Sequence, residues 1–182
     1  AEVMVAAGIN DILLPYNIVG AQKTDRLLRL TRRGATMTVA VDSLDTAQGI
    51  SATAQKMGGS VRVWIEMDTG GKRCGVQSPQ AAQSLAQQIV ELPGIDLQGV
   101  MTYPSRPEAK TFLDETVALF TKDGLPIQTV SLGGTGAEQL SKELGGTEHR
   151  AGSYLWEGLD RIRSSADLND ERAFGECASG FK

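Results

Sequence analysis

The chain has 182 residues, of which 41% are hydrophobic and 22% are charged, the balance of an ordinary globular domain. A net charge of -4 argues against a nucleic-acid partner, and no apolar run reaches the roughly 18 residues that span a membrane. The two cysteines, Cys74 and Cys177, make no disulfide framework, and no signal-peptide pattern opens the chain, so we expect a cytoplasmic protein.

Short β-branched runs alternate along the chain with longer helical patterns, after an N-terminal helix that Gly8 ends. The predicted strands are 11–16, 36–41, 61–67, 97–103, 127–132 and 149–156. The predicted helices between them are 21–32, 44–57, 79–91, 108–122 and 137–144. Because parallel strands need crossover helices, this alternation predicts an α/β fold with a parallel sheet.

Two α/β architectures fit this alternation: a doubly wound open sheet and a parallel (β/α)8 TIM-like barrel. No G-x-G-x-x-G motif follows the first strand, which weakens the dinucleotide-binding version of the open sheet. A barrel has eight strand–helix units over about 250 residues, whereas this chain has about six, so the barrel would be incomplete. A polar stretch at 164–170 favours a domain boundary near that point.

A turn with two adjacent glycines, EMDTGGKRCG, follows the strand at 61–67. Barrel active sites form at the carboxyl ends of strands, and the glycines would let Arg73 point back over the barrel mouth. A guanidinium group there could bind a phenolate or a carboxylate. A turn with a solvated arginine explains the same residues equally well.

A second glycine-rich segment, SLGGTG, joins a predicted strand to a short helix. Consecutive glycines expose backbone N–H groups, the helix N-terminus adds a positive field, and Ser131 and Thr135 add hydroxyl donors. The alternative is a plain tight loop. We favour a phosphate site because barrel phosphate sites recur between a strand and a helix.

The segment EHRAGSY lies on the last predicted strand, where alternation would put Arg150, Gly152 and Tyr154 on one face. His149, the only histidine, is expected to be a surface or packed side chain, and a His-rich metal site is excluded within this chain. Tyr103 ends its strand, and a lone tyrosine is more often a packing residue than a catalytic one.

Taken in order, IEMDTGGKRCGV, GVMTY, VSLGGTG and EHRAGSYLW resemble the alanine-racemase-like, fold-type III barrels that bind pyridoxal phosphate (PLP). The branch with D-threonine aldolase and D-serine dehydratase is most similar, and the resemblance extends to about Trp156. It implies a barrel without its first two units. Residues 1–160 would form a partial PLP-binding barrel, and residues 161–182 would connect to a C-terminal β domain.

The resemblance also implies where PLP would bind. Arg73 would approach the phenolic oxygen of PLP, Tyr103 would lie beside the pyridine ring, and Arg150 would lie near the ring nitrogen. The phosphate contacts would come from two segments with backbone N–H and hydroxyl donors, namely Ser131, Gly133, Gly134 and Thr135, together with Gly152 and Ser153.

The lysine that forms the Schiff base with PLP in this family lies at the end of the first strand. No segment of this chain matches it, and Lys23, Lys56, Lys72, Lys110, Lys122, Lys142 and Lys182 fall in predicted helices, turns or the tail. We therefore expect the catalytic lysine to be absent from this chain. A divalent metal is expected only in the C-terminal β domain.

The function implied by the resemblance is that of a PLP-dependent lyase acting on a D-amino acid with a β-hydroxyl group, homodimeric at full length. The chain alone would be inactive, and its unpaired edge strands, 11–16 and 149–156, would associate with other chains. The alternatives are a PLP-dependent racemase, a non-catalytic PLP-binding protein and a phosphate-binding barrel without PLP. Aldolases commonly carry Gly-His where Pro104 and Ser105 follow Tyr103, so aldolase and dehydratase both stay open.

Overall fold

The structure is a computed structural model, and it describes residues 1–152. The chain divides into two compact units, Ala1–Arg150 and Ala151–Lys182, and every helix and strand of the described residues lies in the first. The domain boundary expected at residue 160 lies outside the described residues and stays a prediction.

Within the described residues, strands and helices alternate along the chain as expected. The strands are β1 (Asp11–Leu14), β2 (Thr36–Val41), β3 (Val61–Met67), β4 (Ile95–Thr102), β5 (Thr129–Gly133) and β6 (Glu148–Arg150). The helices are α1 (Glu2–Ala6), α2 (Ala21–Arg32), α3 (Leu44–Met57), α4 (Pro79–Ile89), α5 (Ala109–Asp123) and α6 (Glu138–Glu143).

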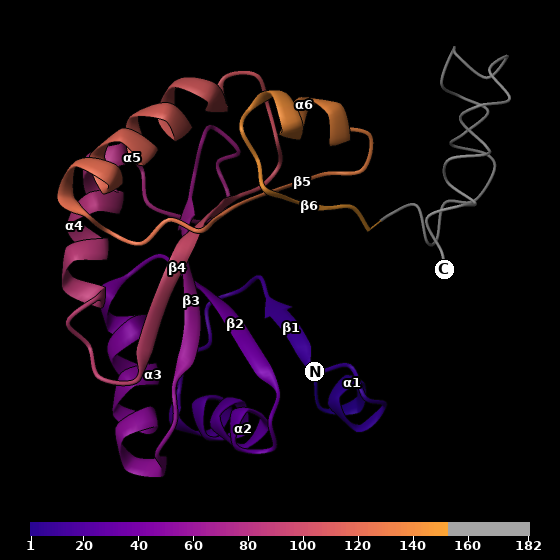
Figure 1. The fold of residues 1–182 in the computed structure, drawn as a ribbon, viewed down its shortest axis with the longest axis vertical. Helices are drawn as coiled ribbons and strands as arrows, with labels where there is room; N and C mark the ends of the chain where they lie inside the picture. The colour runs from indigo at the N-terminus through magenta and orange to yellow at the C-terminus, as the bar shows by residue number, and fades with distance from the viewer. Residues whose placement is uncertain (153–182) are drawn as a thin grey trace, which may run out of the picture. The chain divides into compact units, whose positions relative to one another are not determined.

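Each strand pairs in parallel with the next along the chain, giving the sheet order β1-β2-β3-β4-β5-β6. This sequential order is that of a barrel, because the strand order of a doubly wound sheet reverses partway across. The sheet curls, and α2 to α5 lie along its outer face (Figure 1). In the described residues β1 and β6 are the two open edges, so the sheet is the incomplete parallel barrel that the sequence predicts.

The main hydrophobic core lies between the outer face of the sheet and the helices. Strand alternation turns Met37, Val39 and Val41 of β2 toward the helices, which contribute fully buried side chains such as Leu28 and Phe120. Full burial of one such side chain contributes about 1.5–3 kcal/mol. The packed outer face therefore holds the strands in place and fixes the positions of the residues that end them.

The inner, concave face of the sheet carries mostly polar side chains. Its apolar part is a small cluster of Ala40, Trp64 and Met101. On the amino-terminal side of this cluster a cavity of about 360 Å³ is lined by charged residues, among them Arg62 and Glu148. A second cavity lies on the carboxyl side of the cluster, where the sequence motifs converge.

Local chemistry explains where several elements begin and end. Ser43 caps α3 by accepting a hydrogen bond from Thr46, and Ser78 caps α4, which starts with Pro79 as predicted. Strand β1 ends at Leu14, short of the predicted residue 16, because the following residue is a proline and has no N–H group to donate.

The prediction that Arg150 and Gly152 share one face of a long last strand is wrong. Strand β6 is only three residues long, because it pairs with β5 at Ser131–Gly133 and β5 ends there. Gly152 follows the strand and is exposed, and the rest of the predicted strand, from Ser153 on, lies outside the described residues.

Candidate functional site

The conspicuous sequence motifs meet at the carboxyl edge of the sheet, around a cavity of about 240 Å³. Its lining residues all lie at or just after the ends of strands, namely Pro15, Tyr16, Glu66, Arg73, Cys74, Met101, Tyr103 and Arg150. Hollows of about 310, 360, 380 and 420 Å³ lie elsewhere, but none of them is lined by residues from more than one of those motifs. The carboxyl edge is where barrel enzymes place their active sites, so this cavity is the candidate site.

The turn after β3 brings Arg73 back to the cavity. An oxygen of Asp68 accepts hydrogen bonds from the N–H groups of Gly70 and Lys72, at 3.1 and 2.9 Å. Burial opposes ionisation of Asp68, but these backbone bonds outweigh it and lower the pKa of this carboxyl group. The returning chain then pairs with the end of β3 through Val76, so the turn is fixed at both ends.

Two arginines converge on the ring of Tyr103. The guanidinium carbon of Arg73 lies 4.7 Å from the ring centroid, and that of Arg150 lies 6.0 Å from it. Both distances are within the range of cation–π contacts. Tyr103 itself is 40% exposed, so this arrangement presents an aromatic ring and two positive charges to a ligand.

Hydrogen bonds to the surrounding protein hold the Arg150 side chain in place. Its Nε donates to the hydroxyl of Ser131 at 2.9 Å, and its Nη2 donates to the carbonyl of Thr102 at 2.6 Å. Burial lowers the pKa of this guanidinium group, and the charge of Glu148 opposes that shift. Ser131 in turn donates its proton to Glu148 at 2.7 Å. The Ser131 hydroxyl, expected to contact phosphate, therefore positions Arg150.

Sequence reasoning missed a buried acid in this cavity, Glu66, which is 6% exposed. One of its oxygens accepts a hydrogen bond from the thiol of Cys74 at 3.2 Å, and the other is buried without a hydrogen-bond partner. Burial raises the pKa of Glu66, although the Cys74 bond opposes the shift. Burial and this carboxyl group together raise the pKa of Cys74 to about 11. Strand alternation, which puts Glu66 on the inner face with Trp64, was the available signal.

The three glycine N–H groups of the SLGGTG segment all donate to acceptors of the protein. Gly133 donates to the hydroxyl of Ser105 at 3.0 Å, and Gly134 donates to the carbonyl of Arg150 at 3.2 Å. The N–H of Gly136 instead donates to the carboxylate of Glu138 at 3.0 Å, in an exposed setting. Of the three glycine N–H groups, it is therefore that of Gly136 which already binds an anionic oxygen.

The first glycine of the loop has little free space around it. A Cβ on Gly133 would lie 3.0 Å from the carbonyl oxygen of Arg150 and 3.2 Å from the ring of Tyr103. The loop and the aromatic ring are therefore in close contact, which brings Gly133, Gly134, Arg73, Tyr103 and Arg150 together at one edge. Thr135 lies in the same loop and is half-buried. Ser153 lies outside the described residues.

Comparison with known proteins places this arrangement in a family. Residues 1–159 match the alanine racemase N-terminal domain. The chain is 33% identical to a 3-hydroxy-D-aspartate aldolase of Paracoccus denitrificans over 175 residues, covering 88% of this chain and 45% of the relative. It is also 33% identical to a D-threonine aldolase of Arthrobacter over 167 residues, covering 84% of this chain and 44% of the relative.

Solved structures of related proteins have the same fold. The crystal structure of D-threonine aldolase from Filomicrobium marinum superposes with a TM-score of 0.82 at 28% identity, over 90% of this chain and 48% of that one. The chain thus belongs to the family of the alanine racemase N-terminal domain, and it spans about half the length of the curated relatives described here. PLP, the cofactor expected from the sequence, is the cofactor of this family.

Two searches of residues 1–152 bear on other expectations. None of their helices is long and apolar enough to cross a membrane. The same residues contain no group of three or more histidine, cysteine, aspartate or glutamate side chains placed to hold a metal ion.

Proposed function

We propose that this chain forms the PLP-binding half of a lyase that acts on a D-amino acid with a β-hydroxyl group. The observation that carries the proposal is the convergence of Arg73 and Arg150 on the ring of Tyr103, in contact with the glycine loop. The names of the relatives support it, since they are aldolases and a dehydratase of D-threonine or D-3-hydroxyaspartate.

The residues present suit the chemistry of PLP. The N–H of Gly136 already donates to a carboxylate oxygen. The loop therefore offers a hydrogen-bond donor for an anion such as phosphate. Arg73 would contact the phenolic oxygen and Tyr103 would lie beside the ring. Arg150 would lie near the ring nitrogen, which would accept a hydrogen bond, because a guanidinium group only donates. When bound, PLP supplies an electron sink that weakens the bonds at the substrate's Cα.

We further propose that the catalytic lysine is not among the described residues. The lysines of α2, α3, α5 and α6, and Lys72 in the turn after β3, are all exposed. The candidate cavity is lined by no lysine of the described residues. Lys182 lies outside them. The divalent metal expected for a C-terminal β domain would likewise be bound outside the described residues.

A homodimer at full length is a proposal as well, and so is a cytoplasmic location. The dimer is proposed from the family resemblance. The open edges at β1 and β6 would make only the isolated chain associate, because a complete barrel has no unpaired strand edge. Light scattering of the intact protein tests it. A mass twice that of one chain is expected, and a monomer at micromolar concentration would contradict it.

The lyase is tested by incubating the intact protein with PLP and either D-threonine or D-3-hydroxyaspartate. An aldolase releases glycine and an aldehyde product, whereas a dehydratase releases ammonia and a keto acid. Formation of either set of products supports the proposal. Racemisation of D-alanine without lyase products would favour the racemase. PLP binding with no turnover of any of these substrates would favour the non-catalytic protein.

A further inference from the structure

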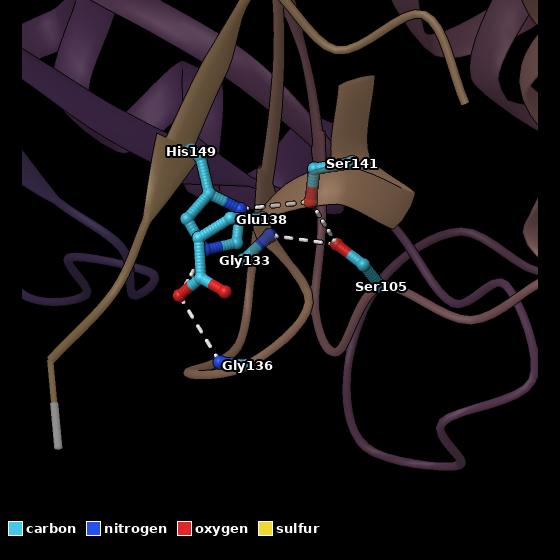
Figure 2. Close-up of polar contacts among 6 residues, drawn as sticks. All are labelled: Ser105, Gly133, Gly136, Glu138, Ser141 and His149. Carbon is cyan, nitrogen blue, oxygen red and sulfur yellow. Dashed lines mark hydrogen bonds and ion pairs between the residues drawn. The ribbon is translucent and has the colours of Figure 1, made fainter. Parts of the chain in front are cut away.

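A chain of hydrogen bonds runs from the glycine loop to the only histidine of the sequence (Figure 2). The N–H of Gly133 donates to Ser105 Oγ at 3.0 Å, and Ser105 Oγ lies 2.9 Å from Ser141 Oγ. Ser141 Oγ lies 2.8 Å from Nδ1 of His149. These residues come from the segment after β4, from β5, from α6 and from β6. The series of hydrogen bonds therefore joins four separate parts of the fold.

The first donor in this series of hydrogen bonds limits which hydroxyl groups donate and which accept. The N–H of Gly133 can only donate, so Ser105 Oγ accepts and its own proton is available for Ser141. Ser141 can then donate to His149 where Nδ1 is the unprotonated ring nitrogen, whereas a protonated Nδ1 donates to Ser141 instead. Ser105 and Ser141 are 7% and 2% exposed, and buried hydroxyl groups of this kind need partners. With Nδ1 as the acceptor, both hydroxyl groups have a donor and an acceptor.

The other ring nitrogen of His149 faces the far end of the same loop. Its Nε2 lies 3.6 Å from Oε1 of Glu138, which is too long for a hydrogen bond, and the two groups form an ion pair when the imidazole is protonated. The same Glu138 oxygen accepts the N–H of Gly136 (Figure 2). His149 thus reaches Gly133 through two hydroxyl groups and Gly136 through one carboxylate.

The hydroxyl branch also fixes the aromatic side of the candidate site. The N–H of Ser105 donates to the carbonyl of Gly133 at 2.7 Å, so Ser105 and Gly133 are joined by two hydrogen bonds. Tyr103 lies two residues before Ser105, and its ring lies against Gly133. A loss of the hydroxyl branch would therefore loosen both the loop and the Tyr103 segment.

We propose that His149 is a positioning residue that sets the phosphate affinity of the glycine loop, acting through two branches of opposite sign. The branch through Ser141 and Ser105 holds the loop in its binding geometry. The branch through Glu138 keeps a carboxylate on the Gly136 N–H, which a phosphate ester has to displace. The inference rests on the proposed function, because it takes the loop as the phosphate site of PLP.

Paired variants of the intact protein separate the two branches. His149→Asn leaves an amide oxygen near the position of Nδ1, whereas His149→Gln extends toward Nε2 and leaves Ser141 without its acceptor. Ser105→Ala breaks the hydroxyl branch directly, and Glu138→Gln removes the competing charge. Ser84→Ala, on the exposed side of α4, is the matched control.

The experiment measures the affinity of each variant for PLP and for inorganic phosphate by calorimetry, together with amide hydrogen exchange of Gly133 without ligand. Ser105→Ala and His149→Gln should weaken both affinities about fivefold to tenfold, the effect of one lost buried hydrogen bond, and speed up exchange at Gly133. Ser84→Ala should behave as the wild type. His149→Asn keeps an acceptor for Ser141 but loses the contact with Glu138, so it should bind phosphate as tightly as the wild type or more tightly. Glu138→Gln should tighten phosphate binding about threefold or more, since one like charge is removed.

The inference is overturned if the wild type binds PLP and Ser105→Ala and His149→Gln bind it equally well, whatever happens to exchange at Gly133. It is also overturned if His149→Asn loses as much affinity as His149→Gln, or if Glu138→Gln weakens binding. A wild type that binds inorganic phosphate in the expected order of variants but does not bind PLP supports the inference and contradicts the proposed function. A wild type that binds neither contradicts both.

Discussion

Buried Glu66 and half-buried Cys74 form an acid–thiol pair in the wall of the candidate cavity, and each changes how readily the other ionises. Burial raises the pKa of both groups, and the thiol donates its proton to the carboxyl oxygen at 3.2 Å. The second Glu66 oxygen is buried without a hydrogen-bond partner. A buried polar atom of this kind is costly unless a ligand or water pairs with it, so the pair should respond to pH and to substitution.

The stability of the protein should depend on the ionisation of Glu66. Its folded pKa is raised above the value of about 4.3 in an unfolded chain, so the folded state holds this proton more tightly. The stabilising contribution is full below the unfolded pKa and is lost as the pH rises through the folded pKa. Glu66→Gln does not ionise and should gain stability relative to the wild type as the pH rises from 4 to 8.

Urea unfolding of the wild type and Glu66→Gln at several pH values measures this difference. The wild type should fall behind the variant steadily across the window. A difference that stays constant from pH 4 to 8 would show that Glu66 titrates normally. Asp114→Asn, at an exposed i,i+4 ion pair on α5, is a suitable control because its carboxylate is not buried.

The thiol of Cys74 should be slow to alkylate. Its pKa of about 11 leaves little thiolate at pH 8, and reaction with iodoacetamide should be on the order of a hundredfold slower than for a free cysteine. Glu66→Gln removes the neighbouring charge and should speed up the reaction. The measurement is mass spectrometry in a Cys177→Ser background, with the urea-unfolded protein as the fast reference. Alkylation of the folded wild type at the unfolded rate would refute this assignment.

At the scale of elements, the turn between β3 and α4 decides where Arg73 lies. Gly75 has φ +116°, and a Cβ there would lie 2.6 Å from the carbonyl carbon of Met67. Gly70, in the same turn, has a similar φ of +109°, but a Cβ there would meet nothing within 4 Å. The two glycines therefore differ in steric clash and share the same kind of backbone strain.

Gly75→Ala should cost more stability than Gly70→Ala, by about 1–3 kcal/mol, since only the first adds a backbone clash to the strain of positive φ. It should also weaken PLP binding by moving Arg73 away from Tyr103. Urea unfolding and PLP titration of the two variants measure both effects. Equal losses in the two variants would mean that the turn can rearrange freely around Gly75.

The elements themselves were largely readable from the sequence, because apolar runs and helical spacing record which face of each element is buried. Arg73 and the glycine loop were also readable, because glycine pairs mark turns at strand ends. Ser105, Ser141 and Glu138 were not, because their roles depend on contacts between segments far apart in the chain. The predicted length of β6 was wrong for the same reason, since its partner strand ends at Gly133.

At the scale of the whole described unit, the curled sheet separates two tasks. Its outer face is a continuous apolar core under the helices, and its inner face carries charged and polar side chains around two cavities. The ends of β3, β4, β5 and β6 bring an aromatic ring, two arginines and a glycine loop to one edge. This arrangement of an aromatic ring, two arginines and a glycine loop is the basis of the proposed PLP site.

The central claim is that this edge binds PLP, and a crystal structure of the intact protein grown with PLP tests it most directly. The account predicts the phosphate group at the loop of Gly133–Gly136, the ring beside Tyr103 and the phenolic oxygen within hydrogen-bond distance of Arg73. It also predicts that the Glu138 carboxylate has left the N–H of Gly136. PLP bound elsewhere, or bound at this edge with its phosphate away from the loop, would contradict the account.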